Sequence, residues 1–125
     1  MPLPLSHIRV LDLSRVLAGP LCTQHLADMG AEVIKIESPS GDSARHRGPF
    51  PGRTPHPEKS GLFLYLNTNK RGVTLNLEDS RGRDVFDRLI GQADLLIHNV
   101  HPTKMAAQGL EYDRLAGLNS GLVMT

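Results

Sequence analysis

The chain has 125 residues, the size of one domain at most, and 39% of them are hydrophobic while 22% are charged, as in ordinary globular proteins. The formal net charge of +1 argues against bulk attraction to nucleic acid or to an anionic membrane, and no apolar run approaches the length that a bilayer requires. A single cysteine, Cys22, excludes an internal disulfide framework, so we expect a cytoplasmic protein.

The first part of the chain predicts a β-α-β unit. Ile8 to Leu13 is an apolar run with β-branched residues that is long enough for a buried strand. A helix is expected around Pro20, because the fixed φ of proline is helical and its missing N–H would be unpaired in a first turn. Gly30 can end that helix with a positive φ, and Ala31 to Ile36 forms a second apolar strand. Two strands joined in this way are parallel, with a right-handed crossover.

The middle of the chain differs in composition. Glu37 to Ser60 holds five of the nine prolines and three glycines, which predicts a loop without regular elements. A loop of this length is either functional or disordered. Three arginines within it, Arg45, Arg47 and Arg53, are interpreted as solvated, with binding of phosphate or of a carboxylate substrate as the alternative. Gly61 to Leu66 is a short apolar segment that fits either one turn of helix or an edge strand.

The remainder alternates strands and helices. Gly72 to Leu77 alternates apolar and polar residues and predicts a strand. Asp79 to Gly91 predicts an amphipathic helix whose first or second residue can cap it. Further strands are expected at Ala93 to Asn99 and from Gly121 to Thr125, with a short helix at Tyr112 to Leu118 between them. This alternation predicts an α/β fold, with a Rossmann-like, mostly parallel sheet and flanking helices.

The loop after the first strand, Ser14 to Ala18, is one candidate site. Ligands of open α/β sheets bind beyond the carboxyl ends of the strands, and the helix that follows offers unpaired N–H groups to an anion. The alternative is that Gly19 and Pro20 only shape a tight turn. The loop lacks the G-x-G-x-x-G pattern, so it does not predict a dinucleotide site.

A second candidate is the pair of adjacent cations Lys70 and Arg71, which precede a predicted strand. A guanidinium fork and an ammonium group both suit phosphate, so the pair could form a phosphate clamp. The alternative is a solvated turn with capping asparagines. His98 and His101 do not predict a metal site, because such sites need three or four ligands and no cysteine or carboxylate cluster accompanies the histidines.

Four segments together resemble the start of the class III CoA-transferase family, which includes formyl-CoA transferases, carnitine CoA-transferases and α-methylacyl-CoA racemases. The matching segments are VLDLSRVLAGP at Val10–Pro20, LADMGAEVIKIESPSGD at Leu26–Asp42, NTNKRGVTLNL at Asn67–Leu77 and ADLLIHNVHP at Ala93–Pro102. They follow the family's order and approximate spacing. The resemblance implies that residues 1–125 are a single amino-terminal part of a CoA-binding α/β domain, truncated at its carboxyl end.

The resemblance also implies which residues contact CoA. The expected contacts are Arg15, Val16, Leu17, Ala18, Asn69, Lys70, Arg71, Asn99, Val100 and Lys104. The loop at 15–18 is expected along the CoA chain, the cations at 70 and 71 at the nucleotide, and residues 99 and 100 along the pantetheine arm. Many family members carry an arginine near the position of Ala107, and Lys104 is expected to supply that charge here.

By resemblance, the function is the transfer of CoA between an acyl-CoA and a carboxylic acid. An aspartate of the family attacks the thioester, and the reaction passes through an aspartyl-CoA thioester. That aspartate is expected beyond Thr125, so we expect no catalytic residue here and no activity of the chain alone. A racemase of the same family and a non-catalytic CoA- or nucleotide-binding fragment remain alternatives. The family further implies no covalently bound cofactor, CoA or acyl-CoA as substrate, an interlocked homodimer, and neither nucleic acid nor membrane as partner.

Overall fold

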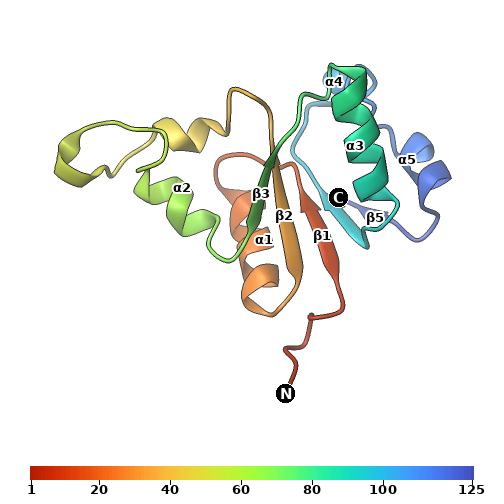
Figure 1. The fold of residues 1–125 in the computed structure, drawn as a ribbon, viewed down its shortest axis with the longest axis horizontal. Coiled ribbons are helices and arrows are strands. Elements are labelled where there is room, and N and C mark those ends of the chain that lie inside the picture. The colour runs from red at the N-terminus through yellow and green to blue at the C-terminus, as the bar shows by residue number, and fades with distance from the viewer.

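A computed structural model describes residues 1–125, and its centre is a five-stranded sheet in which every neighbouring pair of strands is parallel. The strands are β1 (Arg9–Asp12), β2 (Glu32–Glu37), β3 (Arg71–Thr74), β4 (Leu95–Ile97) and β5 (Val123–Met124). Their order is β3-β2-β1-β4-β5, so the chain runs outward from β1 to β3 and then returns to the other side of β1 (Figure 1). The predicted α/β class with a parallel sheet is therefore confirmed. The order reverses between β1 and β4, which is where ligands bind in open α/β sheets.

Helices cover both faces of this sheet. One face carries α1 (Ala18–Asp28), and the other carries α3 (Ser80–Ile90) and α5 (Tyr112–Leu118). The remaining helices are α2 (Gly61–Leu66), α4 (Pro102–Met105) and the short 3₁₀ helices η1 (Ser43–His46) and η2 (Pro51–Arg53). The core beneath α1 consists of Val10, Ala27, Ala31, Val33 and Ile97. A larger core on the other face includes Leu11 of β1, Phe86 of α3 and Leu115 of α5. Neighbouring residues of one strand thus enter different cores, as the strand period of two requires.

The predicted helices agree with the structure where a local signal marks their ends. The Asp79 carboxylate accepts a hydrogen bond from the Arg81 N–H and caps α3. The helix expected over 112–118 is α5. Gly30 follows α1 with a φ of 102°, a left-handed conformation that glycine adopts without strain.

In three other segments the structure differs from the prediction or selects one of its alternatives. The strand expected at Gly72 to Leu77 is shorter in the structure, because its pairing with β2 begins at Arg71 and ends at Thr74. The segment Gly61 to Leu66 is a helix rather than an edge strand. The short helix α4 was not predicted, although Pro102 stands in its first turn and the His101 side chain accepts a hydrogen bond from the backbone after it.

The segment η1–η2–α2 forms an arm that extends away from the sheet (Figure 1). The stretch before α2, predicted as a loop without regular elements, contains η1 and η2, and its prolines limit regular structure there to these short 3₁₀ turns. The guanidinium of Arg45 pairs with Glu37 at 2.7 Å and lies 3.8 Å from the centroid of the Phe63 ring. The expectation that Arg45 is solvated is therefore wrong, because these contacts anchor the arm, whereas Arg47 and Arg53 are exposed.

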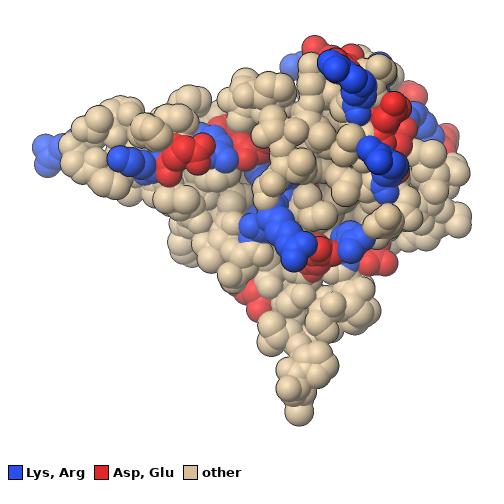
Figure 2. All heavy atoms as spheres, viewed as in Figure 1, with Lys and Arg blue, Asp and Glu red and all other residues tan.

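Basic and acidic side chains are interspersed on the face of the molecule shown in Figure 2. This arrangement agrees with a formal net charge of +1. None of the helices has the combination of length and apolar character that crossing a membrane requires.

Candidate functional site

A cleft of about 640 Å³ lies beyond the carboxyl ends of the strands. The segments that follow the four strands β1 to β4 contribute Arg15, Ser38, Asn76 and Asn99 to its lining, and α4 contributes Lys104. The cleft therefore opens at the reversal of strand order, and two cations face it. Apolar side chains near the ends of the strands also line it, namely Leu13, Ile36, Leu75, Leu77 and Val100. The lining is completed by one carboxylate, Glu78, and by Pro39, Ser40, His101 and Gln108.

The loop from Ser14 to Leu17 holds its shape through its backbone. The side chain of Asn99, which follows β4, accepts a hydrogen bond from the Arg15 N–H at 3.1 Å and donates one to the Arg15 carbonyl at 3.0 Å. The N–H groups of Ser14 and Val16 donate to the carboxylates of Asp12 and Asp42. The N–H of Leu17 donates to the Arg15 carbonyl at 3.1 Å. Every N–H of the loop is thus already bonded within the protein.

Val16 lies at the tip of this loop in an unusual conformation. Its φ is 70°, and the hydrogen bond from Leu17 back to Arg15 closes a three-residue γ-turn around it. A positive φ is a genuine outlier for a β-branched residue, because Cβ then crowds the backbone. Gly19 is the second residue of α1, directly after this turn, and a Cβ on it would collide with the Ser14 side chain. The chain therefore turns more sharply here than most sequences allow.

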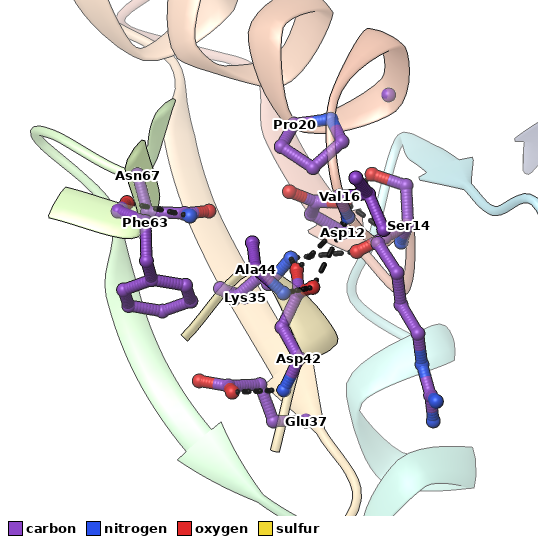
Figure 3. A network of polar contacts seen from close by, with 12 residues as sticks. Asp12, Ser14, Val16, Pro20, Lys35, Glu37, Asp42, Ala44, Phe63 and Asn67 are labelled. Carbon is purple, nitrogen blue, oxygen red and sulfur yellow. Dashed lines mark hydrogen bonds and ion pairs between the residues drawn. The ribbon is translucent and has the colours of Figure 1, made fainter. Parts of the chain in front are cut away.

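A buried ion pair lies directly beneath the loop (Figure 3). The ammonium of Lys35 is 2.8 Å from Asp42 and donates to the Ser14 carbonyl at 2.6 Å. The Asp42 carboxylate also accepts from the N–H of Val16 at 3.1 Å and from the N–H of Ala44 at 2.9 Å. Burial raises the pKa of the Asp42 carboxyl, but the hydrogen bond from Lys35 and those from backbone N–H groups outweigh burial and hold the pKa below its ordinary value.

A second buried ion pair joins β1 to the segment before β3. The ammonium of Lys70 contacts Asp12 at 3.0 Å and donates to the Pro20 carbonyl and to the Asn67 side chain, each at 2.9 Å. Asp12 also accepts from the Thr23 hydroxyl at 2.6 Å. Burial lowers the pKa of Lys70, and the neighbouring Asp12 carboxylate opposes that effect only in part. Both ion pairs lie on the α1 side of the sheet, between the apolar core there and the carboxyl ends of the strands. Their buried polar groups form hydrogen bonds with one another.

Comparison with known proteins agrees with this architecture. Residues 5–125 match the model of a family described as CoA-transferase family III.

The chain belongs to CoA-transferase family III.

Curated relatives of this family III chain include two named CoA-transferases. Formyl-CoA:oxalate CoA-transferase of Escherichia coli O6:H1 is 41% identical over 125 residues, which cover 98% of this chain and 29% of that protein. Human succinyl-CoA:glutarate CoA-transferase is 41% identical over 112 residues, covering 88% of this chain and 24% of that protein. The chain therefore spans less than a third of the length of these relatives.

Solved structures share the fold. A CaiB/BaiF family protein from Brucella suis has a TM-score of 0.88 and 35% identity, over 99% of this chain and 33% of that one. The protein Rv3272 from Mycobacterium tuberculosis has a TM-score of 0.85 and 38% identity, over 98% of this chain and 34% of that one. In both, the matched region is about a third of the structure.

The structure places the ten sequence-predicted residues of this family III chain in different surroundings. Arg15, Asn99, Val100 and Lys104 line the cleft. Val16 and Leu17 follow Arg15 in the same loop and Ala18 begins α1, but none of the three lines the cleft. Ala18 and Gly19 are the first residues there whose N–H groups have no hydrogen-bond partner.

The cations at 70 and 71 do not converge on one point. The side chain of Lys70 is 1% exposed, whereas that of Arg71 is 79% exposed and pairs with Glu32 at 3.0 Å, at the amino end of β2. The Asn69 side chain donates to Asp28 at the end of α1. None of these residues lines the cleft, so they do not form a shared clamp in this structure, and their contact with CoA stays a prediction.

Sequence reasoning did not identify the two buried ion pairs. The sequence held one signal for these pairs, which is a charged residue within an apolar strand. Asp12 interrupts the run VLDL at 10–13, and Lys35 interrupts the run VIKI at 33–36. Such a residue is rarely fully buried without a partner, but the sequence does not show which residue that partner is. The structure contains no group of three or more His, Cys, Asp or Glu side chains placed to hold a metal ion.

Proposed function

We propose that this chain forms the CoA-binding part of an enzyme that moves CoA between an acyl-CoA and a carboxylic acid. The observation that carries the proposal is the cleft beyond β1 and β4, because it combines cationic and apolar lining at the switch point of the sheet. Its volume falls within the range of about 300–1,000 Å³ that small-molecule sites occupy. The names of the two CoA-transferases above support the substrate class.

The lining of the cleft matches the two kinds of surface that CoA presents. The nucleotide end of CoA carries phosphates, and Arg15 and Lys104 supply positive charge to them. The pantetheine arm is uncharged, and Leu13, Ile36 and Val100 offer it an apolar wall. Residues 16–18 would lie along the arm at the mouth of the cleft. Asn99 acts on the ligand through Arg15, whose backbone it holds.

The chemistry proposed for the complete enzyme is covalent. An aspartate carboxylate attacks the thioester carbonyl, the C–S bond breaks, and a mixed anhydride and CoA thiolate result. The thiolate then attacks the aspartyl carbonyl of the anhydride and releases the first acid, leaving an aspartyl-CoA thioester. The acceptor carboxylate reverses the two steps and leaves as its CoA thioester. We assign no nucleophile within residues 1–125, so this chain alone binds CoA but does not turn over.

The complete enzyme is further proposed to be a cytoplasmic homodimer without a covalently bound cofactor. The homodimer is proposed from the family resemblance alone. A racemase that moves a proton next to the thioester carbonyl would use the same CoA cleft. Measuring transfer against racemisation with the complete enzyme separates the two activities.

Calorimetric titration of the chain tests the proposed site. We expect binding to CoA, weaker binding to dephospho-CoA and the weakest binding to pantetheine, because the phosphates carry the charge. Arg15→Ala and Lys104→Ala should each weaken CoA binding about tenfold or more, as loss of a charge-assisted hydrogen bond does. Arg88→Ala removes the same charge from an exposed position on α3 and should leave the affinity unchanged. Equal binding of CoA and pantetheine, or equal effects of all three substitutions, would contradict the proposal.

A further inference from the structure

We propose that Lys35 and Asp42 are positioning residues for the loop at 14–17, holding its strained turn in the conformation that presents Arg15 to the CoA cleft. This inference rests on the proposed function. It assigns a role to a buried ion pair whose atoms do not line the cleft.

The first argument comes from the strain at Val16. A valine with a φ of 70° is strained and persists only when its surroundings over-determine it. Left to itself, this residue would return to a negative φ. The γ-turn hydrogen bond around Val16 is a weak and strained element by itself. The conformation therefore has to be imposed by groups outside the loop.

The second argument is that the ion pair holds the chain on both sides of Arg15. Lys35 donates to the Ser14 carbonyl at 2.6 Å, and Asp42 accepts from the N–H of Val16 at 3.1 Å. These two groups belong to the peptide units that flank Arg15. A purely apolar pair could fill the same space but could satisfy neither group. The ammonium and the carboxylate thus fix the direction in which the Arg15 side chain leaves the backbone.

The third argument concerns the rigidity of the pair. The side chains of Lys35 and Asp42 are 2% and 0% exposed, so water does not compete with their hydrogen bonds. Asp42 is further fixed from the arm, because its carboxylate accepts from Ala44 and its own N–H donates to Glu37 at 2.8 Å. A buried pair of this kind contributes little net stability compared with an apolar replacement, which fits a role in positioning.

Amide hydrogen exchange of the chain without ligand tests the positioning directly. The double variant Lys35→Met/Asp42→Leu removes both charges at similar volume, so the fold itself should survive. We expect the amide of Val16 to exchange at least tenfold faster than in the wild type, while the amides of Glu32 and Asp94, which donate to β1 and its preceding residue at the far end of the sheet, stay protected. Unchanged protection at Val16 in the folded variant would overturn the proposal.

CoA binding supplies the second measurement, with a rescue. The double variant should bind CoA at least tenfold more weakly than the wild type. Adding Val16→Gly should recover part of that loss, since glycine adopts a positive φ without strain. The matched control is Arg53→Gly, which also replaces a residue at positive φ but lies in the arm away from the cleft, and it should recover nothing.

The outcomes separate this inference from the proposed function. If the wild type binds no CoA, the proposed function fails, while amide exchange still decides whether the pair holds the loop. If the wild type binds CoA and the folded double variant binds it equally well, only the positioning role fails. Should the double variant not fold, Lys35→Gln/Asp42→Asn replaces it, because it removes both charges at similar size and leaves neither one buried and unpaired. Accelerated exchange confined to the loop is then expected, and unchanged exchange at Val16 would refute the role.

Discussion

Lys70 and Arg71 are adjacent in sequence, but substitution of Lys70 should destabilise the fold far more than substitution of Arg71. Lys70→Met removes the only cation paired with Asp12, whose carboxylate is fully buried. Breaking a buried pair in this way costs about 3–5 kcal/mol, a large part of the roughly 5–15 kcal/mol that stabilises a typical domain. With a urea dependence of about 1–3 kcal/mol per M, the midpoint of unfolding should fall by about 1 M or more.

Arg71→Met is the matched control for this experiment. Its ion pair with Glu32 is largely exposed, and such pairs contribute about 0–1 kcal/mol. Urea unfolding of both variants, followed by circular dichroism, gives the comparison. Equal midpoints for the two variants would refute the assignment of Lys70 as a structural residue. A CoA affinity that falls on Lys70→Met while the midpoint and pantetheine affinity stay unchanged would instead show that Lys70 binds phosphate directly.

Three further results are expected. The pKa of Asp42 lies below its ordinary value of 3.8. The stability that this carboxylate contributes is therefore fully present above pH 3.8 and is lost as the pH falls through the lower pKa of the folded state. The free energy of unfolding, measured as the pH is lowered, should depend less on pH in Asp42→Asn than in the wild type. Gly19→Ala should lower the melting temperature, because the added Cβ meets the Ser14 side chain, and Ser14→Gly should recover part of the loss if that collision is the cause. The purified chain should transfer no CoA from an acyl-CoA to a free acid, and measurable transfer in a coupled thioester assay would defeat the proposal that the nucleophile lies elsewhere.

The parts of this structure that sequence could predict are those with local causes. The Asp79 cap, Pro20 in the first turn of α1 and the positive φ of Gly30 depend on neighbouring residues alone, and each agrees with the structure. Strand ends were less accurate because a strand continues only where a partner pairs with it, and β2 stops pairing with β3 at Thr74. Backbone pairing of this kind is a property of the assembled sheet.

The candidate site was predictable only in part for the same reason. Arg15 follows one predicted strand and Asn99 ends another, so their meeting at the carboxyl edge follows from the topology. The surroundings of Lys70 depend on Asp12, a contact between residues 58 positions apart. No pattern around Lys70 distinguishes a buried lysine from a solvated one. Sequence therefore identified the edge of the sheet at which the cleft lies, but not the ion pairs that support it.

The loop at 14–17 separates the residues that set its shape from those that face outward. Its backbone is held by side chains that lie elsewhere in the sequence, whereas the side chains of Arg15 and Leu17 are exposed. Substitution of these exposed residues leaves the scaffold intact, so the surface offered to a ligand can vary without a new backbone. A library randomised at positions 15 and 17 should therefore yield mostly folded chains with altered ligand preference. The same library at positions 35 and 42 should yield mostly chains that have lost the turn.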